Sequence, residues 1–350
     1  MNTKIYMPIL KGKKGEFDAL KMLDESTQSV ILPVIEVPAI PWDFVNEKEN
    51  SSIEKQINST VKSIKNVWNI DNEILIETKN LNEAYDADRK TINVLTQLLI
   101  DEGYKPIPVI SIYASDELLS SLVYQDFICL RIAFDDQEFL DINDEIQKIK
   151  KALNSDLSDI ILLLDMGYLS PDNVLMNNMS CKAFINSIND LGLFKDFYFS
   201  ATSFPINLSG CKSNSITEIE RVEVSLRNFF QGASPKLSIK PKFADYGISN
   251  PGFEEMDPRL MTIGASIRYT SDKSWIIFKG ASIKKHGSDQ YYSLCIQIVD
   301  SNSYSGEDFS WGDKQITDKS MRMGGPGNST VWRQIATNHH IEFVVNQLSN

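Results

Sequence analysis

Short apolar runs alternate with longer segments of helical period through the first 240 residues. The runs predict eight strands: Lys4–Lys11, Val30–Val37, Glu73–Lys79, Ile107–Tyr113, Asp126–Phe134, Asp159–Met166, Asp196–Thr202 and Lys236–Lys240. The segments between them predict seven helices: Glu16–Leu23, Ser59–Val67, Ala87–Glu102, Asp116–Tyr124, Asp144–Leu153, Cys181–Leu191 and Ile216–Phe230. Because parallel strands need a crossover connection, this alternation indicates a parallel sheet. Eight such units in about 250 residues fit a (β/α)8 TIM-barrel-like domain better than a doubly wound sheet.

The pattern changes after residue 241. Two apolar runs around the polar turn Thr270–Lys273 predict a hairpin, and Asp289–Val299 predicts a helix. A glycine-rich loop then leads into a final helix, capped by Asn328 or Ser329. We therefore expect a barrel domain over residues 1–247 and an α+β extension over residues 248–350, packed on the barrel.

Alternation along the strands separates an outer face from an inner face. Ile128, Leu130 and Ile132 share one face and suit contact with helices, while Arg131 lies on the opposite face. By the same parity, Glu36, Glu77 and Asp165 lie on the faces opposite the helices. A polar or charged residue stands late in most of the strands: Lys11, Glu36, Glu77, Lys79, Ser111, Tyr113, Arg131, Asp165, Ser200 and Lys240.

Barrel enzymes place their sites at the carboxyl ends of the strands, so these residues predict a polar pocket at the barrel mouth. The candidates for catalysis are Glu36, Glu77, Arg131 and Asp165. The candidates for ligand binding in the same ring are Lys11, Lys79, Tyr113 and Lys240. Carboxylates beside cations can carry out acid–base chemistry or hold Mg²⁺ around a phosphorylated ligand. They can equally form a structural ion network, and the sequence leaves these readings open.

Four further candidates for ligand binding lie after the strands. Asp245 belongs to the tripeptide DYG, and Arg268 lies in a segment where basic and aromatic residues alternate. Arg333 flanks the glycine-rich loop RMGGPGNST, which leads into a helix N-terminus, a position that favours an anion. His339 and His340 are adjacent on that helix, about 100° apart, so they cannot chelate one metal ion as an i, i+4 pair would. The alternatives for these residues are a buried packing histidine, an ordinary helix cap and an amphipathic hairpin.

Composition and charge narrow the function classes. The chain has 350 residues and a formal net charge of -12, which argues against non-specific binding to a nucleic-acid backbone. The four cysteines are scattered without a CxxC pair, so a zinc or redox cluster is not expected. Neither a GxxxxGK[ST] nor a GxGxxG phosphate-binding motif is present. With no apolar run of about 18 residues, we expect a cytoplasmic protein that does not enter the membrane.

The opening YMPILKGKKGEFDALKML, followed by ILPVIEVP, resembles the Protein beta family of bacteriophages and prophages. DYG at Asp245–Gly247, IRYT at Ile267–Thr270 and the later WRQIATNHH resemble that family in the same order. The resemblance implies a phage or mobile-element setting and a role in phage–host conflict, as defence or as modulation of infection. It implies no reaction and no catalytic residues. The main hypothesis is an interaction protein with a protein partner, a phage component or a small anionic ligand. The alternative is a barrel enzyme acting on a phosphorylated or nucleotide-like ligand.

Overall fold

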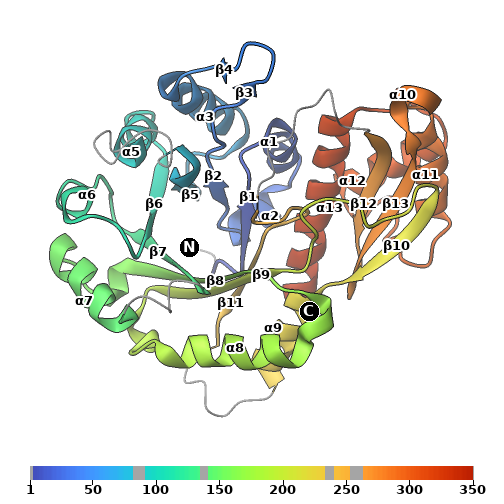
Figure 1. The fold of residues 1–350 in the computed structure, drawn as a ribbon. Coiled ribbons are helices and arrows are strands. Elements are labelled where there is room, and N and C mark those ends of the chain that lie inside the picture. Colours follow the sequence, from blue (N-terminus) through green and yellow to red (C-terminus); the bar gives the residue numbers. More distant parts are fainter. Residues whose placement is uncertain (1–2, 82–90, 135–140, 233–239, 253–262, 350) are drawn as a thin grey trace.

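The computed structural model describes residues 3–81, 91–134, 141–232, 240–252 and 263–349. Eight strands close into a barrel in the order β1-β11-β9-β8-β7-β6-β5-β2, and every neighbouring pair within it is parallel. Figure 1 shows the helices as an outer ring around these strands. The predicted (β/α)8 TIM-barrel-like fold is therefore confirmed.

The barrel strands are β1 (Tyr6–Leu10), β2 (Val34–Glu36), β5 (Glu73–Glu77), β6 (Lys105–Ser111), β7 (Ile128–Ala133), β8 (Ile160–Tyr168), β9 (Asp196–Thr202) and β11 (Lys242–Asp245). The helices around them are α1 (Lys14–Lys21), α2 (Glu25–Val30), α3 (Ile53–Val67), α5 (Thr91–Asp101), α6 (Asp116–Ser120), α7 (Ile142–Leu153), α8 (Val174–Ser187) and α9 (Val222–Gly232). A small hairpin, β3 (Trp42–Asp43) and β4 (Lys48–Glu49), precedes α3.

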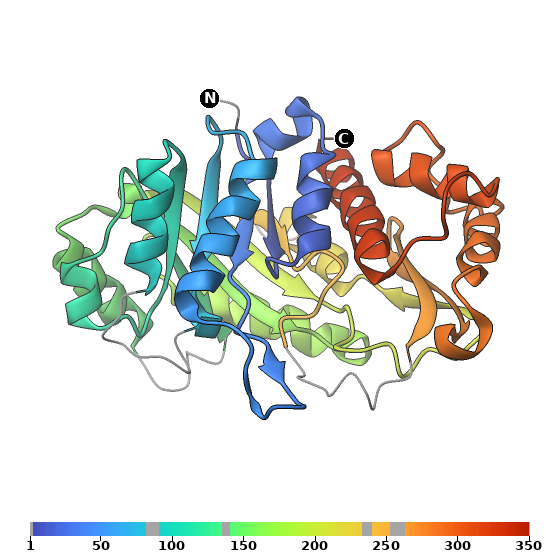
Figure 2. The ribbon, with the colours of Figure 1, turned by 90° about the horizontal axis from the view of Figure 1, so that it is seen from above.

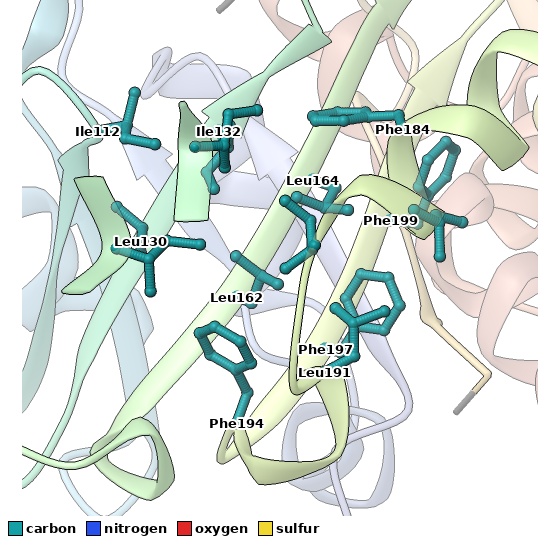
Figure 3. Close-up of a cluster of buried hydrophobic side chains, with 14 of the residues drawn as sticks. Ile112, Leu130, Ile132, Leu162, Leu164, Phe184, Leu191, Phe194, Phe197 and Phe199 are labelled. Atoms are coloured by element: carbon teal, nitrogen blue, oxygen red, sulfur yellow. The ribbon is translucent and has the colours of Figure 1, made fainter. Parts of the chain in front are cut away.

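The outward faces of the strands form one apolar layer with the helices. Leu130 and Ile132 of β7 lie beside Leu162 and Leu164 of β8, and Phe184 of α8 packs against this layer (Figure 3). Alternate residues of the same strands point inward, where a second apolar cluster fills the barrel. It consists mainly of Met7, Ile9, Leu32, Val34, Leu75, Ile107, Val109, Cys129, Ile161, Leu163, Tyr198, Ala244 and Tyr246. The parity that the alternation predicts is thus the parity of the folded barrel.

Two of the predicted elements are wrong in part. The last barrel strand lies at Lys242–Asp245, so Lys240 precedes it; residues 236–239 of the predicted strand lie outside the described residues. The predicted helix Ile216–Phe230 is divided into the strand β10 (Ser215–Glu220) and the helix α9. The sequence SITEIE alternates polar and apolar residues with period two, which is the pattern of a strand. The first residues of the predicted helix Ala87–Glu102 lie outside the described part of the chain.

The extension begins with the hairpin of β12 (Gly264–Thr270) and β13 (Ser274–Ser282), which confirms the predicted turn at Thr270–Lys273. β10 joins this hairpin, giving a three-stranded antiparallel sheet in the order β10-β13-β12. The helices of the extension are α10 (Ile283–His286), α11 (Gln290–Val299), α12 (Trp311–Ser320) and α13 (Ser329–Ser349). The small sheet therefore draws on residues from both sides of residue 247.

Helix α13 lies between the barrel and the small sheet in both views (Figures 1 and 2). Ile341 and Val344 of α13 belong to the apolar cluster that also contains Tyr6 of β1 and Leu20 of α1. Trp332 and Ile335, about two to three turns earlier, belong to the apolar cluster of the extension. The same helix thus contributes to both cores.

The contact between α1 and α13 depends on Gly15. A Cβ atom at this position would lie 2.6 Å from the carbonyl oxygen of Thr330 and 3.0 Å from Cβ of Arg333. We expect Gly15→Ala to lower the free energy of unfolding by about 1–3 kcal/mol, because the two helices must move apart. The control is Gly325→Ala, where no atom lies within 4 Å of the new Cβ. Equal thermal stability of the two variants would contradict the close packing at Gly15.

Candidate functional site

Arg131 lies at the centre of a polar cluster at the carboxyl ends of the barrel strands. Its Nη1 donates to Glu36 Oε1 at 2.9 Å and to Glu77 Oε2. Its Nε and Nη2 both donate to Asp165 Oδ2, at 3.0 and 2.7 Å. Nη2 also donates to the hydroxyl oxygen of Tyr246 at 2.6 Å. These contacts use all five N–H groups of the guanidinium, and Arg131 is only 6% exposed. We call Glu36, Glu77, Arg131, Asp165 and Tyr246 the mouth cluster.

Two lysines form the rim of the mouth cluster. Lys11 Nζ lies 2.6 Å from Glu36 Oε2, and Lys79 Nζ lies 2.8 Å from Glu36 Oε1 and 3.6 Å from Glu77 Oε2. The side chain of Lys11 is 15% exposed and that of Lys79 is 44% exposed. Three cations therefore balance three carboxylates, with the exposed charge at the edge and the buried charge at the centre.

Asp165 is held by neighbours on three strands and loops. Its Oδ1 accepts hydrogen bonds from the Ser200 hydroxyl at 2.8 Å and from the Gly167 backbone N–H at 2.9 Å. Its Oδ2 accepts from the Tyr246 hydroxyl at 2.5 Å in addition to Arg131. This number of donors fixes the carboxylate in one orientation.

The electrostatics of the mouth cluster keep Glu36 and Asp165 ionised. Burial by itself would raise the pKa of Glu36, but Arg131, Lys79 and Lys11 outweigh it and hold that pKa well below its usual range. Burial is likewise outweighed at Asp165, whose pKa is lowered by Arg131 and by the hydrogen bond from Tyr246. A carboxylate with such a low pKa is a weak base near neutral pH. The arrangement is therefore better suited to holding charges in place than to transferring protons.

A divalent cation would have to compete with Arg131 for the three carboxylates of the mouth cluster. The three carboxylates converge on the guanidinium of Arg131, which occupies the place that a cation among them would take. Across the described ranges, no group of three or more His, Cys, Asp or Glu side chains is arranged to hold a metal ion. The residues present do not fit the Mg²⁺ site that the sequence left open.

The remaining candidates from the strand ends are Tyr113 and Lys240. Tyr113 follows β6 and is 53% exposed, with its backbone N–H donating to the Ser111 hydroxyl. Lys240 is exposed, and its Nζ donates to the carbonyl oxygen of Gln231 at 2.8 Å. The predicted strand that ends at residue 240 puts Lys240 in the mouth. Because that strand begins at Lys242, the placement of Lys240 in the mouth is wrong.

Three of the predicted cations meet at the segment that follows the eighth barrel strand. Lys11 Nζ donates to the carbonyl oxygen of Pro251 at 2.9 Å, and Arg268 Nη1 donates to that of Ile248 at 3.0 Å. Arg333 Nη1 donates to the hydroxyl of Ser249 at 3.1 Å. We call Lys11, Arg268 and Arg333 the cationic seam, because they line the junction of the barrel and the extension.

The cationic seam contains more positive than negative charge among the described residues. Arg333 Nη1 lies 3.3 Å from Oε1 of the buried Glu16, which is the carboxylate that it pairs with. Arg268 stacks over Phe204, with its guanidinium carbon 5.0 Å from the ring centroid. Burial, and then the charge of Arg333, lower the pKa of Arg268 to about 10. Two arginines that repel each other in a partly buried place would be stabilised by an anion.

Asp245 lies in a different buried cluster, on the outer side of β11. Its Oδ1 accepts hydrogen bonds from the Tyr6 hydroxyl at 2.6 Å and the Gly247 N–H at 2.9 Å, and His340 Nε2 lies 3.0 Å from its Oδ2. His340 Nδ1 lies 2.9 Å from the hydroxyl of Thr270. Burial lowers the pKa of His340, so the ring is neutral at pH 7. These contacts join β1, β11, β12 and α13, and so they link the barrel to the extension. We call Tyr6, Asp245, Thr270 and His340 the clasp.

His339 is fully buried on the neighbouring face of α13. Its Nε2 lies 2.9 Å from the carbonyl oxygen of Thr270, which can only accept a hydrogen bond, so Nε2 bears a hydrogen. Its Nδ1 lies 2.8 Å from Oδ2 of Asp313, and Oδ1 of Asp313 accepts from the Tyr269 hydroxyl at 2.7 Å. The ring has no exposed nitrogen, so His339 is placed for packing and hydrogen bonding and not for contact with a ligand.

Sequence reasoning missed several residues of these clusters. Tyr246 carries no signal beyond its place in DYG, although it follows β11 with the parity of the inward Ala244. Asp313 had no signal beyond its place after Ser310, whose hydroxyl caps α12. Tyr6 carried no signal, because a tyrosine in an apolar strand looks like a core residue. The three C-terminal motifs DYG, IRYT and WRQIATNHH prove to meet in space at Asp245, Thr270 and His340.

A family model described as Beta protein matches residues 6–346, which is nearly the whole chain. A comparison with curated proteins and one with solved structures found no significant match. Within the described residues, every helix is too short or too polar to cross a bilayer.

Proposed function

Because the chain belongs to the Beta protein family, we propose that it acts in phage–host conflict by binding an anionic ligand at its barrel mouth. Phage–host conflict takes place within the infected cell, so the proposal places the protein in the cytoplasm. The ligand is a small molecule or the anionic part of a phage component or other protein partner. Binding is favoured over the alternative, catalysis on a phosphorylated or nucleotide-like ligand, because Glu36 and Asp165 of the mouth cluster are weak bases.

The observation that carries the proposal is the convergence of Lys11, Arg268 and Arg333 on Ile248–Pro251. This segment follows the eighth strand, and barrels frequently bind phosphate groups at the loops after their last two strands. Arg268 makes one hydrogen bond within the described residues, so most of its five donors are available to an acceptor. Lys11 belongs to the cationic seam and also donates to Glu36, so an anion bound at the seam would act directly on the mouth cluster.

The test is a thermal-stability titration with inorganic phosphate and with pyrophosphate at constant ionic strength. We expect the melting temperature of the wild type to rise with ligand concentration, since a ligand that binds only the folded state stabilises it. Arg268→Gln should lose this rise, and the exposed Lys151→Gln should retain it. An equal rise in both variants would remove the cationic seam as the binding site.

The biological half of the proposal is tested by plating phage on cells that carry each variant. Arg268→Gln should lose any change in plating efficiency that the wild type causes, at a temperature where the variant stays folded. If Arg268→Gln changes plating as the wild type does, the role in phage–host conflict does not depend on the cationic seam. If the wild type itself has no effect over a broad phage panel, the conflict role is rejected while anion binding can still stand.

A further inference from the structure

Strand β10 is an edge of the three-stranded sheet, and half of its backbone groups face away from its neighbour. The Arg221 N–H donates to the Lys273 carbonyl oxygen at 2.8 Å, so residues 221 and 273 form a hydrogen-bonded pair. Opposed residues of antiparallel strands alternate between hydrogen-bonded and non-bonded pairs. The odd-numbered residues of β10 therefore bond to β13, and the N–H and C=O groups of Ile216 and Glu218 point outward. Within the described ranges, no other group bonds to these outward backbone groups.

The two faces of β10 differ in character. Ile216, Glu218 and Glu220 are exposed on one face, where Ile216 is an apolar residue with 51% of its surface accessible. Thr217 and Ile219 lie half-buried on the other face, toward the loop that connects β9 with β10. An edge strand with an exposed isoleucine and free backbone groups is a surface that another strand can extend.

A cleft of about 710 Å³ adjoins the half-buried face of β10. Its lining includes Thr217 and Ile219 of the strand together with Tyr168, Ile206, Cys211 and Asn250 from the barrel side. None of its lining residues is charged. The size and composition match a site that receives apolar or small polar side chains.

We propose that β10 binds an extended peptide segment of a partner protein as a fourth strand of this sheet. In such a complex, backbone hydrogen bonds to Ile216 and Glu218 supply affinity, and alternate side chains enter the cleft and supply specificity. Side chains directly opposite each other on paired strands share a face. The residues opposite Glu218 and Glu220 are therefore basic, and the residues between them are apolar. This surface is separate from the cationic seam, and the inference does not depend on the proposed anionic ligand.

The probe is a fluorescent peptide of alternating lysine and valine residues, with binding measured by fluorescence anisotropy. A peptide of the same composition, with its valines and its lysines in separate blocks, is the control for sequence pattern. A peptide of alternating glutamate and valine is the control for charge. We expect the lysine–valine peptide to bind at least about tenfold more tightly than either control, because only it satisfies both faces.

The decisive variant is Glu218→Pro. Proline removes an N–H that points away from β13, so the bonds between β10 and β13 remain while the outer edge is blocked. We expect loss of peptide binding with an unchanged circular dichroism spectrum. If this variant does not fold, Glu218→Lys serves instead, since it keeps the edge and should reverse the preference toward the glutamate–valine peptide.

Several outcomes would overturn the proposal. Equal peptide affinity of Glu218→Pro and the wild type would show that the edge is not used. Binding of the two control peptides as tightly as the alternating lysine–valine peptide would show that the cleft and the acidic face do not select a pattern. A wild-type dimer that Glu218→Pro dissociates would assign the edge to a second copy of this chain.

Discussion

Replacing Arg131 by alanine is expected to lower the free energy of unfolding by about 3–5 kcal/mol. Among the described residues, Arg131 is the only cation that contacts all three carboxylates of the mouth cluster, and its removal leaves the buried Asp165 without a cationic partner among its direct contacts there. Lys11 and Lys79 can still neutralise Glu36 from the rim. The measurement is equilibrium unfolding in urea, with the melting temperature as a second readout.

Comparing the free energies of unfolding of further variants separates two effects of losing Arg131: the loss of a buried ion pair and the loss of packing. Arg131→Met combined with Asp165→Asn should be more stable than Arg131→Met alone, because the uncompensated charge is then removed as well. Lys151→Ala, an exposed change on α7, should leave the free energy of unfolding within about 0.5 kcal/mol of the wild type. A loss below about 1 kcal/mol for Arg131→Ala would mean that water enters the mouth cluster freely and replaces the lost partner.

The same Arg131→Ala variant distinguishes a structural network from a working site. If the mouth cluster is structural, the effect on phage plating should return at low temperature, where the variant is folded. If Arg131 takes part in recognition, the effect should stay absent at every temperature. With all five of its donors engaged inside the protein, we expect the first result.

Replacing His340 by alanine is expected to cost about 3–5 kcal/mol as well, because Asp245 would keep a buried charge with fewer donors. The ring also stacks on Trp275 at a centroid distance of 5.0 Å, so packing is lost together with the hydrogen bonds. The matched control is His286→Ala, an exposed histidine in the short helix α10. Urea unfolding of both variants checks this, and equal stabilities would contradict the clasp between α13 and the barrel.

His340 should also give the fold a dependence on pH. Its folded-state pKa lies below the unfolded value of about 6.5, so its contribution to stability is complete above that pH and is lost as the pH falls below it. Asp165, Asp245 and Asp313 have lowered pKa values, so their contributions are lost only below about pH 4. Glu223, whose pKa burial raises, acts in the opposite direction.

The difference between the wild type and His340→Gln isolates the histidine from these carboxyl groups. Between pH 7 and pH 5, the wild type should lose more stability than His340→Gln, because glutamine does not titrate. Parallel stability curves for the two proteins over this range would show that His340 does not titrate in the fold.

The sequence was informative where one physical rule dominates. Alternation along a strand is a strict geometric property, and it placed Glu36, Arg131 and Asp165 on the inner face correctly. It could not show that Tyr246 contacts Arg131 and Asp165, since the sequence pattern does not indicate a partner for a tyrosine beyond a strand end. Nor could it show that the carboxylates surround an arginine and not a ligand, because distances across a barrel depend on the closed register.

The errors have physical causes as well. The segment from Ile216 to Phe230 contains both a two-residue and a helical period, and the apolar residues of its second half concealed the change at Arg221. Asp245 was a candidate for ligand binding as part of DYG, but its side chain points to the outer side of β11, where it contacts Tyr6 of β1 and His340 of α13. The partners of a charged residue at a strand end depend on which later helix covers that strand. The local sequence pattern does not identify that helix.

The clasp at Asp245 has a consequence for the way the chain is made. Tyr6 and His340 touch the same carboxylate, yet they are 334 residues apart. At synthesis rates of about 5–20 residues per second, roughly 15–70 s separate the appearance of these two side chains at the ribosome. During that interval the apolar face of β1 and α1 that α13 later covers is open to other molecules. We therefore expect the nascent chain to expose an apolar surface that chaperones can bind, and this surface is covered only when residues 329–349 have been added.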